Sequence, residues 1–471
     1  MVFATGSLLV AAEPSGPRLP LQSCLIEGVD GEIGCGTHDV LENRASESGR
    51  RIALKVVVLR AREAKREPDP LFILAGGPGQ AATDNAKFIA RTFAQVRAHR
   101  DIVLVDQRGT GGSNPLNCDL YGSSTQDHLR DLLPEASVRQ CIAQWQGRAD
   151  LRFYTSDVAM ADLDEVRAAM GYERINLFGT SYGTRTAQVY MRQYPDRVRA
   201  VILKGVTSIT TPLTVPMARD AQRAWDLLCE DCAAEPACHA AFPKLKEEFN
   251  AVFERLEKEV EVELPASAGA GSERVKLSRA AAAPTIRSLL QSIDSSADLP
   301  LIIHQAYGGD YAPLAKAALS VRKPFAKIVS VGVFLAVSSS EDVAVSDEEE
   351  IARGGTGTFL RDDYFKQLQR AAKLMPRVEM PAGYRAPVSS DIPTLLISGF
   401  LDPATPPDGA EEVAGRLLNS RHVIARYGSH SYGGMSPCVD TFMAKFIARG
   451  SAEGLDTTCS EAIRRPPFAV K

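Results

Sequence analysis

A serine set between two glycines restricts the possible folds of this chain more than any other feature. The pentapeptide GTSYG at 179–183 follows the apolar run 174–178 and precedes a segment with helical periodicity at 182–194. A serine on a sharp strand-to-helix turn has its hydroxyl exposed above the sheet, and the small neighbours let strand and helix approach closely. We therefore predict that Ser181 is a nucleophile; an ordinary glycine turn is the alternative.

Apolar, β-branched runs alternate with amphipathic helices on both sides of this turn. Strands are expected at 50–60, 71–75, 102–106, 174–178, 201–204, 394–398 and 421–427. Helices are expected at 157–170, 182–194, 409–418 and 437–449. This alternation predicts an α/β fold with a mostly parallel sheet and helices on both of its faces.

The alternation stops between 212 and 387, where the pattern is mainly helical apart from an Ala/Gly/Ser-rich segment at 266–272. A block inserted after the carboxyl end of a strand lies above the sheet edge where α/β proteins bind ligands. We therefore predict that 212–387 is a helical lid or cap. The catalytic domain would then consist of 24–211 and 388–471.

The N-terminus and the cysteines bear on cellular location. Residues 1–12 (MVFATGSLLVAA) look like the second half of a secretory signal peptide, so we interpret 1–23 as the remnant of a signal peptide and leader. A misassigned start is the alternative. The spacing of the nine cysteines suggests four neighbouring pairs and a free Cys229: Cys24–Cys35, Cys118–Cys141, Cys232–Cys238 and Cys438–Cys459. Such disulfides suit a periplasmic or secreted protein, whereas buried free thiols are the alternative.

A serine hydroxyl needs a base, oriented by a carboxylate, to act as a nucleophile at neutral pH. In a fold with this turn, the acid and then the base follow the serine along the chain. Asp402 comes just after the strand expected at 394–398 and is the candidate acid, whereas Asp408 looks like the cap of the next helix. Of the seven histidines, only His422 and His430 lie beyond Asp402. His422 opens a strand, so His430, in a loop of small residues, is the candidate base.

The oxyanion of a tetrahedral intermediate needs backbone N–H donors. We expect one from Tyr182, directly after the nucleophile, and one from Gly77 in the loop GGPG at 76–79. A phosphate-binding loop is excluded there because no Lys-Ser/Thr follows. The glycine-rich segment 106–113 (DQRGTGGS) is interpreted as scaffold.

Composition excludes several classes of function. The net charge of −4 lacks the basic character of a nucleic-acid-binding protein. No apolar run approaches the roughly 18 residues of a membrane span. No Cys/His spacing typical of zinc sites occurs, and neither a metal nor an organic cofactor is implied. The expected partner is a peptide or small-molecule substrate, and the oligomeric state stays open.

Together these motifs resemble the prolyl- and tripeptidyl-aminopeptidase branch of the α/β-hydrolase superfamily. The matching stretches are GGPG (76–79), DQRGTGGS (106–113), GTSYG (179–183), LDPATPP (401–407), GSHSYGG (428–434) and the terminal pattern from Cys438 to Cys459. The chain departs from the family at Ala75, where relatives usually have His before GGPG. It also has Ser339 and Ala372 at positions where relatives often carry cysteines, which suggests one bridge lost as a unit.

The resemblance implies an exported serine aminopeptidase that forms an acyl-enzyme on Ser181. Such an enzyme must bind a charged α-amine, and the resemblance makes Glu341 and Asp342, in AVSSSED, the candidate lid carboxylates, of which Glu341 is preferred. A solvated acidic loop is the alternative, since acidic residues continue at 347–350. An esterase or other small-molecule hydrolase with the same triad, and a binding protein without catalysis, are the rival functions.

Overall fold

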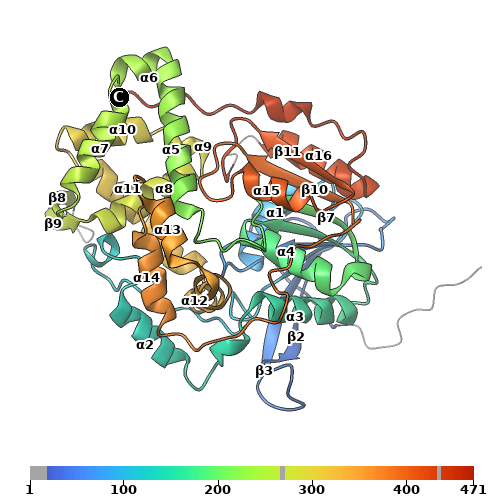
Figure 1. Ribbon diagram of the computed structural model, residues 1–471. Helices are drawn as coiled ribbons and strands as arrows, with labels where there is room; N and C mark the ends of the chain where they lie inside the picture. Colours follow the sequence, from blue (N-terminus) through green and yellow to red (C-terminus); the bar gives the residue numbers. More distant parts are fainter. Residues whose placement is uncertain (1–18, 266–270, 432–435) are drawn as a thin grey trace, which may run out of the picture.

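A nine-stranded sheet runs through the computed structural model, which describes residues 19–265, 271–431 and 436–471 (Figure 1). The strands follow the order β1-β2-β3-β5-β4-β6-β7-β10-β11. Their bounds are β1 (Gln22–Ser23), β2 (Ile33–Leu41), β3 (Arg51–Leu59), β4 (Leu71–Leu74), β5 (Ile102–Val105), β6 (Ile175–Thr180), β7 (Val198–Lys204), β10 (Thr394–Gly399) and β11 (Ser420–Ala425). The signal-peptide prediction falls largely on 1–18, outside the described residues.

The sheet is parallel from β5 to β11 and antiparallel from β1 to β5. Every residue of β4, β5 and β10 is buried, as expected for parallel strands covered on both faces. The predicted α/β class and mostly parallel sheet are therefore confirmed. Strand β2 was not predicted, because glycine and polar residues interrupt its apolar pattern (IGCGTHDVL).

Helices cover both faces of the sheet. On one face α3 (Ser156–Ala169), α4 (Tyr182–Gln193) and α15 (Pro407–Ala414) share a core with Leu177 of β6. On the other face α1 (Ala86–Thr92) and α16 (Ser436–Arg449) share a core with Phe178. Adjacent residues of a strand point to opposite faces, so β6 contributes to both cores and its carboxyl end lies between them.

The segment between β7 and β10, called the insertion below, forms a second group of elements beside the sheet (Figure 1). Its helices are α5 (Met217–Ala234), α6 (Pro236–Ala241), α7 (Leu245–Arg255), α8 (Arg279–Leu290), α9 (Ile293–Ser296), α10 (Leu299–Tyr307), α11 (Ala312–Ile328), α12 (Val331–Val337), α13 (Glu348–Gly355) and α14 (Asp363–Ala372). A separate apolar core unites α5, α7, α8, α10 and α11 and includes the stacked rings of Trp225 and Phe249, whose centroids lie 4.0 Å apart. Helices α12 and α14 instead contribute to the core of the sheet domain.

The insertion also contains a β-hairpin, which the helical expectation did not include. Strands β8 (Val260–Pro265) and β9 (Ser272–Leu277) pair antiparallel, and alternate residues of both are buried. The Ala/Gly/Ser-rich segment connects them, and its residues 266–270 lie outside the described part of the chain. A strict alternation of glutamate with valine or leucine in 260–264 is the signal for this hairpin in the sequence.

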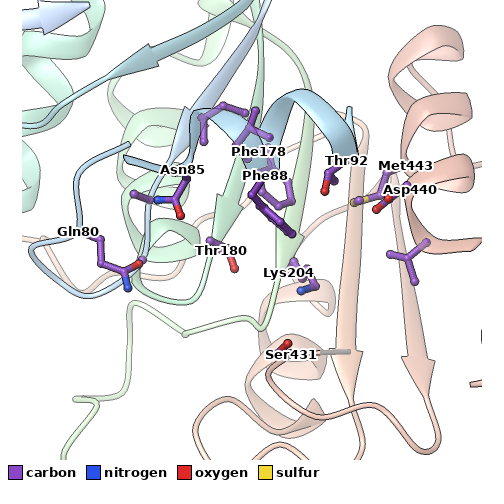
Figure 2. Close-up of a pocket in the computed structure, with 15 residues that line it drawn as sticks. Gln80, Asn85, Phe88, Thr92, Phe178, Thr180, Lys204, Ser431, Asp440 and Met443 are labelled. Atoms are coloured by element: carbon purple, nitrogen blue, oxygen red, sulfur yellow. The ribbon is translucent and has the colours of Figure 1, made fainter. Parts of the chain in front are cut away.

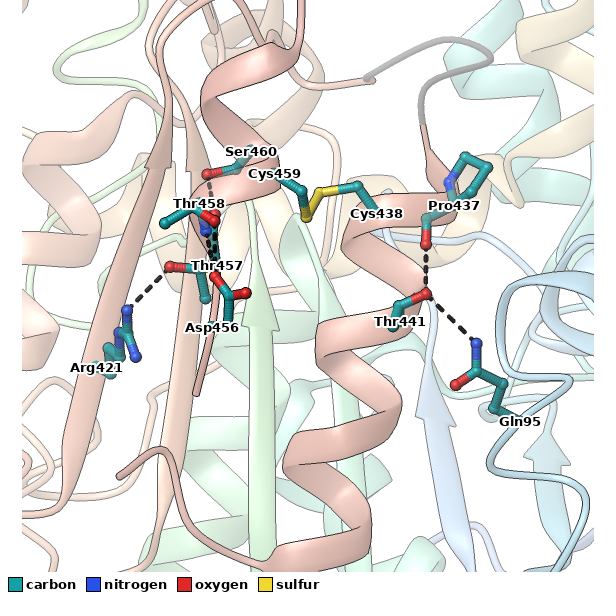
Figure 3. Close-up of a disulfide and its surroundings, with 10 residues drawn as sticks. All are labelled: Gln95, Arg421, Pro437, Cys438, Thr441, Asp456, Thr457, Thr458, Cys459 and Ser460. Carbon is teal, nitrogen blue, oxygen red and sulfur yellow. Dashed lines mark hydrogen bonds between the residues drawn. A yellow bond between two sulfur atoms is a disulfide. The ribbon is translucent and has the colours of Figure 1, made fainter. Parts of the chain in front are cut away.

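Four disulfides join the cysteine pairs suggested by the spacing: Cys24–Cys35, Cys118–Cys141, Cys232–Cys238 and Cys438–Cys459. Cys229 is buried and unpaired. Figure 3 shows the last bridge, which connects α16 to the terminal 3-10 helix Thr458–Ala462. Next to it, Arg421 Nη2 donates to Thr457 Oγ1 at 2.9 Å and links this segment to the edge strand β11.

Across the residues that the structure describes, none of the helices has both the length and the apolar character needed to cross a membrane.

Candidate active site

Ser181 occupies a strained turn between β6 and α4. Its φ of 55° and ψ of −125° are rare for a residue other than glycine. The flanking glycines make the turn possible by close packing. A Cβ on Gly183 would lie 2.1 Å from the carbonyl oxygen of Leu74, and one on Gly179 would lie 2.4 Å from that of Gly183. The geometry is that of a serine held out above the carboxyl edge of the sheet.

Asp402 and His430 meet at the carboxyl ends of β10 and β11. His430 Nδ1 lies 2.7 Å from Asp402 Oδ2, and the aspartate is fully buried. Asp402 also accepts hydrogen bonds from the amides of Ala404 (2.7 Å) and Thr405 (3.0 Å) and from the Thr405 hydroxyl (2.8 Å). Burial acts to raise the pKa of Asp402, but the charge of His430 and these hydrogen bonds outweigh it and lower the pKa to about 2. The aspartate is therefore ionised at neutral pH, and His430 Nδ1 carries the hydrogen that it accepts.

The turn after β7 brings the serine and the imidazole to the same place. Ser181 N donates to Lys204 O at 3.0 Å. The next residue, Gly205, has a φ of 64°, and a Cβ there would lie 3.3 Å from His430 Cε1. Ser181 thus bonds to the backbone of this short turn, and His430 packs against its glycine. Gly205 and Thr405 were not among the residues predicted from the sequence, because their importance depends on which loops meet.

The loop that carries Gly77 packs directly on the nucleophile. A Cβ on Gly76 would lie 3.4 Å from Ser181 Cβ, and Gly77 has a φ of 114° that suits glycine alone. Gly79 O accepts a hydrogen bond from Ser330 N of the insertion at 2.8 Å. The amides of Gly77 and Tyr182 therefore come from two loops that converge on Ser181.

The segment 106–113 braces the neighbouring loops. Asp106 is fully buried and accepts hydrogen bonds from the amides of Thr83 and Gly112, both at 2.9 Å. Arg108, also buried, donates to both carboxylate oxygens of Asp162 on α3, at 2.6 and 2.7 Å. Neither side chain is part of the Ser181–Asp402–His430 cluster, which is what a scaffold role requires.

Glu341 lies in a buried network rather than on a solvated loop. It stands in a π-helical turn, Ser338–Asp342, and is fully buried. Its carboxylate accepts hydrogen bonds from Ser156 N (2.7 Å), Ser156 Oγ (2.8 Å) and the hydroxyl of Tyr384. Ser156 Oγ is also 2.7 Å from the hydroxyl of Tyr182. Burial raises the pKa of Glu341, whereas nearby Arg185 acts to lower it. Glu341 is thus connected through Ser156 to the residue that follows the nucleophile.

A cavity of about 110 Å³ lies beside the nucleophile, on the face of the sheet covered by α1 and α16 (Figure 2). Thr180 and Ser431, the chain neighbours of Ser181 and His430, line it. Burial lowers the pKa of Lys204 in this cavity and raises that of Asp440 to about 6. Apolar side chains and two titratable groups therefore line the same cavity. The rest of the GSHSYGG motif, 432–434, lies outside the described residues.

Comparison with known families places the sequence motifs in two matched segments. Residues 69–241 match the α/β hydrolase fold family. Residues 369–459 match the family described as TAP-like protein. The first segment contains Ser181, and the second contains Asp402 and His430.

Three individual relatives are each described as a peptidase or a protease. A tripeptidyl aminopeptidase of Streptomyces coelicolor is 25% identical over 501 residues, covering 98% of this chain and 90% of the relative. The serine protease Hip1 of Mycobacterium tuberculosis is 31% identical over 187 residues, which is 36% of each chain. A proline iminopeptidase of Xylella fastidiosa is 28% identical over 137 residues, covering 29% of this chain and 32% of the relative.

Proposed function

Because this chain is a serine peptidase with the α/β-hydrolase fold, we propose that it is an aminopeptidase that releases N-terminal residues or tripeptides from peptides. The observation that carries the proposal is the similarity to a tripeptidyl aminopeptidase over 98% of the chain, insertion included. A similarity confined to the sheet domain would speak only for the triad, because one fold hosts many functions.

The proposed mechanism is acyl transfer. His430 takes the proton of Ser181, and the serine oxygen attacks the scissile carbonyl. The amides of Tyr182 and Gly77 donate hydrogen bonds to the oxyanion. Protonated His430, oriented by Asp402, then gives the proton to the leaving amine, and a water molecule activated in the same way releases the acyl group.

We propose that the insertion acts as a lid over this site. It is bonded twice to the loop of His430: Ser429 Oγ donates to Leu290 O at 2.7 Å, and Ser431 N donates to Gln291 O at 2.8 Å. The Ser330 bond to Gly79 O makes the third attachment. A lid attached in this way limits access to Ser181, which suits an enzyme that acts on chain ends.

Glu341 stays our candidate for binding the α-amine. In the free protein the Tyr384 hydroxyl donates to its carboxylate, and an ammonium group would replace that donor. The ammonium would donate a charge-assisted hydrogen bond, which is stronger than the bond from the neutral phenol that it replaces, and Arg185 Nη1 would stay 3.8 Å from the same carboxylate.

Four disulfides support the further proposal that the protein is exported to the periplasm or secreted. Disulfides persist in oxidising compartments and are rare in the cytosol.

The test of the proposed function is kcat/KM for a tripeptidyl anilide with a free α-amine, compared with the same compound acetylated. We expect a large loss of activity on acetylation, no activity in Ser181→Ala, and a smaller preference for the free amine in Glu341→Gln. Equal rates for the two compounds, or turnover of simple esters alone, would overturn the aminopeptidase proposal in favour of an esterase.

A further inference from the structure

Arg287, on helix α8 of the insertion, has a guanidinium without a partner. Its Nε is buried and makes no hydrogen bond. Within residues 19–265, 271–431 and 436–471, none of its other nitrogens forms a hydrogen bond or an ion pair either. Four other arginines also have one buried, unbonded nitrogen, and each of them donates a hydrogen bond through another: Arg185, Arg279, Arg322 and Arg385. The residue as a whole is partly exposed, so its charged guanidinium, which has no protein partner among the described residues, can be reached by an anion from solvent.

The position of Arg287 is set by the contact between α8 and the loop of the candidate base. Leu290 and Gln291, at the end of α8, accept the hydrogen bonds from Ser429 and Ser431 on either side of His430. Arg287 precedes Gln291 by four residues, so the two lie on the same side of the helix, about one turn or 5.4 Å apart. The turn of α8 that carries Arg287 therefore lies next to the part of α8 that contacts the His430 loop.

The groups that act electrostatically on Arg287 also belong to the surroundings of the candidate site. Burial lowers the pKa of Arg287, while Tyr364, Asp402 and Asp220 act to raise it. Both carboxylates are already engaged: Asp402 by His430 and Thr405, and Asp220 by Arg219, whose Nε lies 3.0 Å from Asp220 Oδ1. Two carboxylates thus act on Arg287 from a distance, and neither forms an ion pair with it among the described residues.

We propose that Arg287 binds a carboxylate carried by the leaving-group part of the substrate. The inference rests on the proposed acyl transfer, in which His430 protonates the leaving group, so that this half of the substrate departs on the His430 side. A planar guanidinium matches a carboxylate with two parallel hydrogen bonds. Two sources offer the same chemistry, namely the C-terminal carboxylate of a short peptide and an aspartate or glutamate side chain after the scissile bond.

The test compares kcat/KM for peptides that differ only in that carboxylate, with products measured by mass spectrometry. Ala-Ala-Ala-Ala is compared with its C-terminal amide, and Ala-Ala-Ala-Asp-amide with Ala-Ala-Ala-Asn-amide. We expect the acid of one pair to be preferred by about 10- to 100-fold, the usual worth of a hydrogen bond to a charged group. The pair that shows the preference identifies the source. In Arg287→Gln the preference should disappear while the uncharged peptides keep their kcat/KM within about threefold.

Arg274→Gln is the matched control, because it removes a positive charge from an exposed position on β9 of the same insertion. It should leave the preference unchanged. The proposal is overturned if the wild-type protein prefers neither acid, or if Arg287→Gln lowers the acid and the uncharged peptides equally. Should no peptide be cleaved, the aminopeptidase proposal fails separately, and 4-acetoxybenzoate against its methyl ester then decides the role of Arg287, since the leaving phenol carries the carboxylate.

Discussion

Replacing Asp402 by asparagine should remove most of the activity while leaving the shape of the site intact. The asparagine oxygen still accepts from the amides of Ala404 and Thr405, but its NH2 group faces His430 Nδ1 in place of the carboxylate oxygen 2.7 Å away. An NH2 donor favours the imidazole with its proton on Nε2, which cannot accept the Ser181 proton. We expect kcat to fall about 10³- to 10⁴-fold, as for this change in other triads.

The same substitution should reduce stability in a pH-dependent way. The pKa of Asp402 is lowered from 3.8 to about 2, and a shift of about 2 units corresponds to roughly 2–3 kcal/mol. Because the folded-state pKa is the lower one, this stabilisation is fully present above about pH 4 and is lost as the pH falls toward 2. Asp402→Asn should therefore lower the free energy of unfolding by about 2 kcal/mol at pH 7, and the deficit should shrink between pH 4 and pH 2.

The assay is steady-state hydrolysis of a tripeptidyl anilide together with the rate at which a fluorophosphonate labels Ser181. Asp408→Asn is the control, since Asp408 is exposed in the first turn of α15, six residues along the same segment. The reasoning is refuted if Asp402→Asn keeps kcat within tenfold of wild type, or if Asp408→Asn loses as much.

Three further predictions concern stability, measured by urea unfolding with tryptophan fluorescence. Gly183→Ala should cost about 3 kcal/mol or prevent folding, because a Cβ would lie 2.1 Å from the last carbonyl of β4; a wild-type midpoint would contradict this. Arg185→Met removes the buried cation that lies 3.8 Å from Glu341 and 3.0 Å from Asp342, and leaves only Arg385, at 3.6 Å, beside Asp342; it should cost about 3 kcal/mol. The exposed pair lost in Arg353→Met should cost about 0.5 kcal/mol or less, and equal losses would refute the contrast. Cys438→Ser opens a loop of 21 residues and should cost about 3 kcal/mol. Cys229→Ser, measured under the same non-reducing conditions, should cost less because no bridge is lost, and an equal loss would contradict this.

The parallel half of the sheet could be predicted because its strands are short apolar runs buried on both faces. Strand β2 was missed because glycine and polar residues interrupt its apolar pattern. The hairpin β8–β9 was missed although β8 alternates glutamate with valine or leucine. The hairpin also stands among helices, where the surrounding periodicity favours a helical interpretation.

Some residues of the candidate site could likewise be predicted from the sequence, and others could not. The structure brings Asp402 and His430 together, and their order along the chain after a glycine-flanked serine was enough to select them. The roles of Gly205 and Arg287 depend on contacts between the turn after β7, the base loop and α8, which have no local signature. Glu341 begins an acidic stretch that continues at 347–350, and only the packing of the insertion shows that it is buried while the later acids are exposed.

The four disulfides have a consequence for how the chain can be made. Each joins cysteines only 6 to 23 residues apart, so every bridge can form before the insertion docks on the sheet domain. An oxidant that joins cysteines strictly in order of synthesis yields the native bridges at the first and second pairs only, because the odd Cys229 shifts the pairing of every later cysteine. The third is different, because Cys229 emerges before Cys232 and competes with it for Cys238. In the folded protein Cys229 faces the core from α5, so early folding of that helix would protect the correct pairing, and the insertion is where a recombinant preparation should be examined first for mispaired thiols.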